Sequence, residues 1–297
     1  MADGVEQHEY LTVREVAALL RVTERKVYDL ASSGRVPCSK ATGKLLFPEG
    51  PLRDWITAAQ TGPAASGFAS VDRPAVFLGS HDPLLEWAIR HSDSGLATFF
   101  DASLDGLRRF YAGEGIAAGL HLQEEDGTWN AATVAGALTD QNAVLVHWAR
   151  RTRGFVVRKE HEDRLGDLDA LSELTFAPRQ SEAGSELLLR KVLNEAGLAL
   201  DKIRFGTPCR SEQDAMMAVV QGEADVAFGL QALSAPFGLC FGSVVSESYD
   251  LVVDRKAWFE PPMQYLMAFA KSDRFDEHAS KLVGFDISDL GKVIWNA

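Results

Sequence analysis

The chain has 297 residues, of which 46% are hydrophobic and 24% are charged, as in an ordinary globular protein with room for about two domains. Its formal net charge of −12 argues, for the chain as a whole, against a nucleic-acid-binding protein, which should carry a basic surface. There is no apolar run of about 18 residues, so no transmembrane helix is expected. Residues 1–10 are acidic and polar and lack the pattern of a signal peptide. We therefore expect a cytoplasmic protein with no membrane partner.

The cysteine and histidine residues give no sign of a metal site. Cys38, Cys209 and Cys240 are far apart in the sequence and form no CxxC pair. The histidines are scattered, without an HxxxH or HExxH motif. We therefore expect neither a disulfide framework, nor a metal site, nor a cofactor.

The charge is distributed unevenly along the chain. Residues 1–62 hold eight basic and eight acidic side chains, so the whole net charge of −12 belongs to the remainder. Within residues 21–44 there are six basic and two acidic side chains, a local charge of +4. The charge of the whole chain therefore does not exclude DNA binding by its N-terminal part.

The first sixty residues predict two short helices joined by a tight turn. Thr12 and Glu15 have the spacing of a capping box, and apolar residues at helical spacing follow as far as Leu20. Thr23 is a second N-cap, and Gly34 is placed to end the second helix in a left-handed conformation. This pattern is a helix-turn-helix, whose second helix enters the DNA major groove with its N-terminal end.

A hairpin and a third helix complete this unit. Residues 36–47 predict a hairpin around 41–43, and a helix follows from Pro48, with Trp55 and Ile56 in the core. The order of elements resembles the excisionase/MerR-type winged helix-turn-helix over residues 10–58. The residues that carry this resemblance are 11–20, 22–23, 26–30, Gly34, 36–37, 47–48, Leu52 and Trp55.

The resemblance implies that residues 24–32 lie in the major groove and that the hairpin contacts the phosphates. It implies double-stranded DNA as a partner, bound through Thr23, Arg25, Lys26, Tyr28, Arg35, Lys40 and Lys44. Glu24 and Asp29 depart from the family pattern, and they should weaken nonspecific phosphate attraction. Glu24 could also bias base choice, because Glu can accept from cytosine N4. The alternative is that the basic residues are a solvated face and the unit binds protein.

Residues 61–70 are rich in Gly, Ala, Ser and Pro and predict a linker. We therefore divide the chain into a DNA-binding domain (1–60), a linker (61–74) and a ligand-sensing domain (75–297). In the last of these, strand and helix patterns alternate, which predicts a mainly parallel sheet. The expected strands are residues 75–78, 97–100, 115–122, 143–148 and 154–157, a strand at 174–177, and a turn plus a short strand within 221–229. Polar residues at the carboxyl ends of such strands line the usual ligand crevice.

This part resembles the periplasmic-binding-protein-like sensor domain, a relative of molybdate-type solute-binding proteins. The matching stretches are residues 79–83, 119–122, 127–130, 179–180, 222–227, 249–253 and 284–286. The resemblance implies an α/β fold in which a winged helix-turn-helix precedes a two-lobed, type II periplasmic-binding-protein-like domain. It implies a ligand in the interlobe cleft, bound by Ser80, His81, Ser103, His121, Arg179, Gln180, Gly184, Ser185, Asp225 and Tyr249.

Structural roles remain open for several of these residues. Ser80 and Ser185 could be plain N-caps, and Asp225 could brace a loop. Where the family has a Gly-Ser-Gly-Thr-Arg-like turn, this chain has Glu182 and Glu186, which would repel an oxyanion unless they point away. Three possibilities therefore stay open: an oxyanion such as molybdate or tungstate, a small organic or partly cationic ligand, or a lost response to ligand.

The sequence as a whole favours a ligand-responsive bacterial transcription regulator that is not an enzyme. We expect a homodimer, because a single small module makes few base contacts. The first alternative is an adaptor that does not bind DNA. The second is a cleft enzyme related to molybdopterin metabolism, in which His121 and Asp225 would form an acid/base pair.

Overall fold

The computed structural model describes residues 10–40, 43–58 and 73–297. The chain divides into two compact units, Met1–Gly67 and Phe68–Ala297. The predicted linker at residues 61–74 lies almost entirely outside the described residues. Among the helices that the structure describes, none has the length and hydrophobicity needed to cross a membrane.

The N-terminal unit has the predicted helix-turn-helix. Its elements in chain order are β1 (Tyr10–Thr12), α1 (Val13–Leu20), α2 (Glu24–Ser32), β2 (Leu46–Pro48) and α3 (Glu49–Ala58). The short strand β1 was not expected; it pairs antiparallel with β2, with Leu11 opposite Phe47. Ser39 forms a bridge with Leu46, as a hairpin requires, whereas the predicted turn includes residues 41–42, outside the described part.

Local signals set the ends of these helices. Thr12 and Glu15 form the predicted capping box, and the Thr23 side chain accepts a hydrogen bond from the Lys26 amide. Gly34 has a φ of 66°, so the predicted left-handed position after α2 is confirmed. The helices and strands enclose a small core; its buried residues are Val13, Val16, Ala17, Val27, Val36, Phe47 and Leu52, with Trp55 and Ile56 packed against them.

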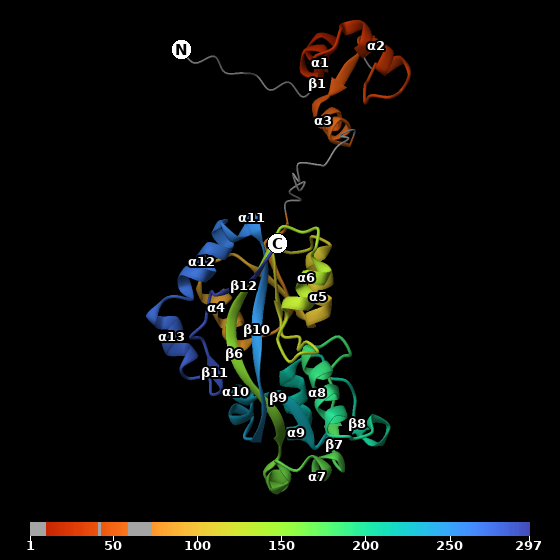
Figure 1. The fold of residues 1–297 in the computed structure, drawn as a ribbon. Coiled ribbons are helices and arrows are strands. Elements are labelled where there is room, and N and C mark those ends of the chain that lie inside the picture. The colour runs from red at the N-terminus through yellow and green to blue at the C-terminus, as the bar shows by residue number, and fades with distance from the viewer. Residues whose placement is uncertain (1–9, 41–42, 59–72) are drawn as a thin grey trace. The chain divides into compact units, whose positions relative to one another are not determined.

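The C-terminal unit is an α/β structure built on one ten-stranded sheet (Figure 1). The strands of its main path lie in the order β4-β3-β5-β10-β6-β9-β7-β8, and β11 and β12 also pair with β6. The strands are β3 (Val76–Ser80), β4 (Ala97–Asp101), β5 (Ala117–Leu120), β6 (Ala143–Val157), β7 (Thr175–Ala177), β8 (Arg204–Phe205), β9 (Val226–Leu230), β10 (Cys240–Asp254), β11 (Phe285–Asp286) and β12 (Val293–Asn296). Strands β3, β4 and β5 are parallel, as are β7, β8 and β9, whereas β6 and β10 run antiparallel to their neighbours.

Helices follow most of the strands. They are α4 (Pro83–His91), α5 (Ser103–Tyr111), α6 (Ala131–Ala137), α7 (Leu168–Ser172), α8 (Gly184–Glu195), α9 (Glu212–Gln221), α10 (Gln231–Ser234), α11 (Arg255–Trp258), α12 (Pro261–Phe269) and α13 (Asp273–Ala279), with short 3-10 helices at Lys159–Arg164, Leu200–Lys202 and Ala235–Phe237. The Asp82 side chain caps α4, and Ser211 caps α9 as predicted.

Two expectations about the strands are wrong. The sheet is not mainly parallel, because its two longest strands, β6 and β10, run antiparallel to their neighbours. Residues 143–148 and 154–157, expected as two strands, belong to the single 15-residue strand β6. The arginines between them lie inside this strand, at positions that alternate between its two faces. Arg151 and Arg153 therefore point to the same side and are fully buried, whereas Arg150 is exposed.

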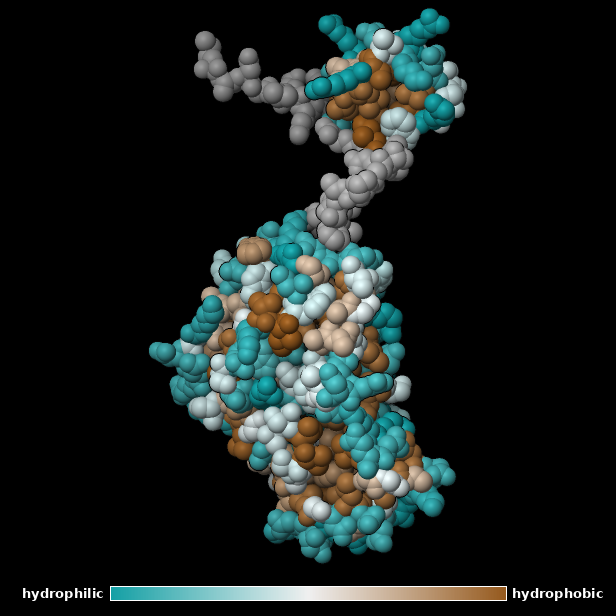
Figure 2. Space-filling model, viewed as in Figure 1, coloured by the Kyte–Doolittle hydropathy of each residue, from teal (hydrophilic) through white to brown (hydrophobic). Residues whose placement is uncertain are grey.

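The sheet carries two lobes with separate cores. Lobe 1 contains β3–β5, α4–α6 and α11–α13; lobe 2 contains β7–β9 and α7–α10 (Figure 1). Residues 143–149 of β6 pack in the cores of lobe 1, and residues 155–157 pack in those of lobe 2. Polar side chains cover most of the face shown in Figure 2, and hydrophobic surface gathers over lobe 2. The stretch 150–153 of β6 thus lies where the two lobes meet.

Candidate functional site

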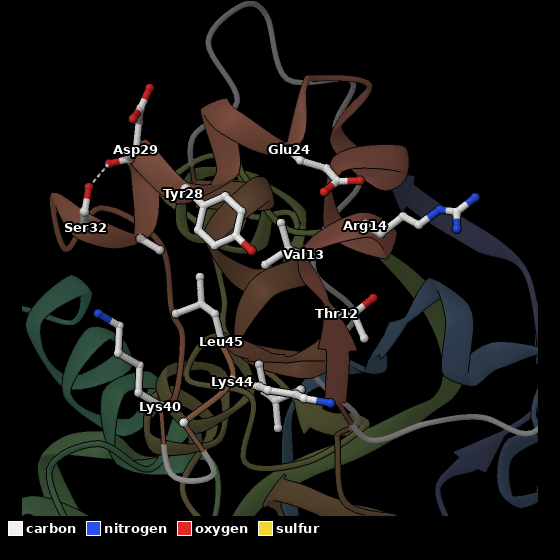
Figure 3. Close-up of a pocket in the computed structure, with 13 residues that line it drawn as sticks. Thr12, Val13, Arg14, Glu24, Tyr28, Asp29, Ser32, Lys40, Lys44 and Leu45 are labelled. Atoms are coloured by element: carbon white, nitrogen blue, oxygen red, sulfur yellow. Dashed lines mark hydrogen bonds between the residues drawn. The ribbon is translucent and has the colours of Figure 1, made fainter.

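The predicted DNA-binding side chains all lie on the surface of the N-terminal unit. Thr23, Arg25, Lys26, Tyr28, Arg35, Lys40 and Lys44 are each exposed. A groove of about 740 Å³, here called the recognition groove, runs between α2 and the hairpin (Figure 3). The hairpin residues that line it, 40 and 43–46, are called the wing below. Its lining residues are Thr12, Val13, Arg14, Glu24, Tyr28, Asp29, Ala31, Ser32, Lys40, Gly43, Lys44, Leu45 and Leu46.

The recognition groove carries charges of both signs. Three cations, Arg14, Lys40 and Lys44, line it together with the carboxylates of Glu24 and Asp29. Figure 3 shows the Tyr28 ring between α2 and Leu45. The sequence interpretation did not include Arg14 in the site. The groove therefore places three cations around a helix face that carries two carboxylates.

Several predicted ligand residues come together between the two lobes. Ser80, at the end of β3, and Ser103, in the first turn of α5, lie with their hydroxyl oxygens 2.7 Å apart. The His121 amide donates to the Ser103 hydroxyl oxygen at 3.3 Å. The Tyr249 hydroxyl donates to the Ser80 carbonyl oxygen. All four side chains are buried, so they form a polar cluster on the lobe 1 side of the interface.

Lobe 2 meets this cluster through the first turn of α8. A Cβ atom on Gly184 would lie 2.5 Å from the His121 carbonyl oxygen, so only glycine permits this approach. Ser185 follows in the same turn and is also buried. Together, Ser80, Ser103, His121, Gly184, Ser185 and Tyr249 are called the interlobe site below.

Two further contacts join the lobes beside the interlobe site. The Gln180 side-chain amide donates to Asp101 Oδ1 at 2.6 Å, and Arg108 donates to Glu182 at 3.0 Å. The Arg179 guanidinium donates to the carbonyl oxygens of Cys209 and Arg210, at 3.1 and 3.0 Å. The lobes are therefore in contact around these predicted residues.

The two acidic residues of the α8 turn are both bound to arginines. Glu182 accepts from Arg108, and Glu186 accepts from Arg190 Nε at 2.8 Å and from the Arg179 amide at 2.9 Å. Each carboxylate thus already has a cationic partner.

The last two predicted ligand residues lie apart from this cluster. His81 Nε2 is 2.8 Å from Glu86, and its ring meets Phe100 edge-on at 5.3 Å between centroids. Asp225 precedes β9, at the end of the strand away from the interlobe site, where it accepts from Arg158 and from the Thr175 amide at 3.0 Å each. His121 instead contacts Glu247, so the acid/base pair of His121 with Asp225 is not formed.

A buried network of five charged residues lies next to the interlobe site, and sequence reasoning missed it. Its members are Asp82, Arg151, Arg153, Glu212 and Glu247. Arg151 binds Asp82 at 3.0 Å and also pairs with Glu247. Arg153 binds Glu247 at 2.7 and 3.0 Å, and Glu212 at 2.6 Å. In the sequence, the two-residue spacing of Arg151 and Arg153 was the one indication that both side chains lie on the same face of a strand.

The environment perturbs the protonation of these groups. Burial alone would raise the pKa of Glu247, but Arg151 and Arg153 outweigh it and hold this pKa well below its usual range. Burial lowers the pKa of His121 despite the nearby Glu247 carboxylate. Glu247 is therefore a carboxylate at neutral pH, and the His121 ring is neutral.

No group of three or more His, Cys, Asp or Glu side chains in the described part of the chain is placed to hold a metal ion. The arrangement that the structure does show is a closed interface between two lobes, held by charge-assisted hydrogen bonds.

Comparison with known families identifies both units. A model of the PBP superfamily domain matches residues 86–271, more than half of the chain. The chain belongs to the PBP superfamily. A helix-turn-helix domain model matches residues 10–60, so the predicted combination of a helix-turn-helix with a PBP superfamily domain is confirmed.

One relative spans the whole architecture. The uncharacterized protein YvgK of Bacillus subtilis (strain 168) is 26% identical over 300 residues, which cover 95% of this chain and 97% of that protein. Two solved structures share the PBP fold. PhnD1 from Prochlorococcus marinus (MIT 9301), in complex with methylphosphonate, has a TM-score of 0.52 at 12% identity and covers 72% of this chain and 92% of its own. The tungstate ABC transporter of Geobacter sulfurreducens has a TM-score of 0.51 at 11% identity, with 69% and 97% covered.

Proposed function

We propose that this chain is a ligand-responsive transcription regulator that acts in the cytoplasm. Two observations together support the proposal. Helix α2, the recognition helix of the helix-turn-helix, is exposed and bordered by Lys40 and Lys44, and the same chain contains a PBP superfamily domain. Helix α2 reads bases in the major groove, and Lys40 and Lys44 neutralise phosphates. This architecture fits a regulator rather than an enzyme.

The interlobe site is the proposed place of the ligand. A small molecule there would contact Ser80, Ser103 and His121 from lobe 1 and Ser185 from lobe 2, with Arg179 and Gln180 at its edge. His81 and Asp225 are left out, because His81 pairs with Glu86 and Asp225 accepts from the Thr175 amide and Arg158. Ligand binding changes DNA affinity only if the ligand prefers one arrangement of the lobes, so the coupling is a difference in affinity between two states.

DNA binding is tested by fluorescence anisotropy on the DNA upstream of its own coding sequence, at several salt concentrations. We expect the affinity to fall with salt, since each phosphate contact releases condensed counterions. The double variant Arg25→Ala/Lys26→Ala should lose most of this affinity. Lys271→Ala/Lys281→Ala removes the same charge from exposed positions of the other unit and should bind normally. Equal binding by the two variants would favour the adaptor, in which the recognition helix binds protein.

Ligand binding is tested by a thermal-shift screen with oxyanions, amino acids and small organic acids, because a ligand of the folded state raises its melting temperature. A hit should also change the DNA affinity.

The proposed homodimer is tested by sedimentation, with and without DNA. It follows from the small size of one helix-turn-helix, whose contact surface gives limited specificity unless two are paired.

A further inference from the structure

Glu247 lies in the middle of β10, opposite Arg151 of β6, where the two lobes meet. Its side chain is fully buried. Each carboxylate oxygen is held by nitrogen atoms from other elements. Oε1 accepts from Arg151 and from Arg153 Nη2, and Oε2 accepts from Arg153 Nε and lies 3.1 Å from His121 Nδ1. Four nitrogen atoms thus surround one carboxylate.

This arrangement has the chemistry of an anion receptor. Two guanidinium groups and an imidazole converge on two oxygens in a site without exposed surface, where charge-assisted hydrogen bonds are strong. Arg151 also binds Asp82 and Arg153 also binds Glu212, so three carboxylates share two guanidinium groups. The anion that completes the receptor is a side chain of the protein itself.

We propose that Glu247 is a built-in counter-ion that fills the anion position between Arg151, Arg153 and His121 where the lobes meet, so that the wild-type domain excludes small oxyanions there. The inference rests on the proposed function, in which the interlobe site takes a ligand, and it restricts the class of that ligand. An incoming anion would meet a fixed negative charge and would have to displace a carboxylate that is held by four nitrogen atoms. The part of the ligand that lies nearest Glu247 is therefore neutral or cationic.

The first test is a melting experiment on the full-length wild-type protein with sulfate, phosphate, molybdate and tungstate. We expect no saturable shift beyond that of sodium chloride at the same ionic strength. A saturable shift that is absent from Arg153→Lys would overturn the proposal, because an anion would then bind beside Glu247. This arm does not depend on whether any Glu247 variant folds.

The second test removes the counter-ion. Glu247→Ala deletes a CH₂–COO⁻ group, which has the size of acetate, and leaves the arginines and His121 around the gap. We expect this variant to melt below the wild type and to be restabilised by acetate. The gain should reach about 5–10 °C at an acetate concentration 100-fold above its dissociation constant. A folded Glu247→Ala that does not respond to acetate would contradict the proposal.

Two controls make the second test specific. Glu247→Gln fills the same space with an amide, so it should not respond to acetate. Glu186→Ala removes another buried glutamate, but its partner Arg190 is 44% exposed to solvent, so no restabilisation is expected. An equal acetate response in Glu186→Ala would overturn the inference. DNA binding is measured separately. If the protein does not bind DNA, the proposed regulator function is rejected, and the melting results still test the role of Glu247.

Discussion

Arg153 Nη2 on β6 donates to Glu212 Oε1 in the first turn of α9 over 2.6 Å, and both side chains are buried. The same guanidinium holds Glu247 on β10, so one side chain joins two strands of the sheet to a helix of lobe 2. Burying charges is costly, and the arrangement is stable only while each charge keeps its partner.

Replacing Arg153 should therefore be severely destabilising. Arg153→Met leaves the carboxylates of Glu212 and Glu247 buried with one cation fewer, and we expect a loss of about 3–5 kcal/mol in the free energy of unfolding. Glu212→Gln keeps the pairing of Arg153 with Glu247 and should lose less, about 1–3 kcal/mol. Urea denaturation of the full chain measures both. The interpretation fails if Arg153→Met is no less stable than Glu212→Gln.

His121 should make the protein sensitive to mild acid. Burial lowers its pKa in the folded protein, so the unfolded chain takes up the proton first, starting near the ordinary value of about 6.5. The stability that depends on the neutral ring is present above that pH, and it is lost as the pH falls toward the lowered pKa of the folded state. His121→Asn keeps a donor for Glu247 without this titration. The melting temperature of the wild type should thus fall more steeply between pH 7 and 5 than that of the variant; parallel curves would reject this role.

Elements with local signals could be predicted from the sequence. Thr12, Thr23 and Ser211 each carry a side-chain cap that is read from residues within one helical turn, and all three helices begin where expected. Strand β6 could not be predicted in the same way, because arginines interrupt its apolar run. Arg151 and Arg153 can be buried because they pair with Glu247, which lies 96 residues after Arg151 in the sequence.

The candidate site was partly predictable for a similar reason. Ser80, Ser103 and His121 follow strands or begin helices, so their meeting at one edge of lobe 1 could be expected from a parallel arrangement. Asp225 precedes its strand, and the same argument would have placed it at the opposite edge, where it lies. Asp82 and Glu212 gave no such indication, because nothing local shows that their side chains face Arg151 and Arg153.

Glu24 should restrict the bases that the recognition helix accepts. Its carboxylate lines the recognition groove (Figure 3). In bound DNA it would repel phosphates and would accept only from a donor such as cytosine N4. Glu24→Gln should bind random-sequence DNA more tightly and lose about 1–3 kcal/mol of discrimination at one base pair. Binding selections on randomised operators measure this change. Asp140→Asn removes one exposed negative charge from the other unit and serves as control. If the two variants show identical base preferences, Glu24 does not contact a base.

Gly184 should be essential for the close contact between the lobes. Alanine is intrinsically better than glycine inside a helix, by about 0.5–1 kcal/mol, and Gly136 of α6 has open space where a methyl group would go. Gly136→Ala should therefore be neutral or stabilising. At Gly184 the added Cβ would lie 2.5 Å from the His121 carbonyl oxygen, which is backbone and cannot rotate away. Gly184→Ala should therefore destabilise by about 1–3 kcal/mol.

Gly184→Ala should also speed amide hydrogen exchange along the first turns of α5 and α8, because the lobes must separate to relieve the clash. Equal stability of the two alanine variants, with unchanged exchange at α8, would show that the lobes do not meet at this turn.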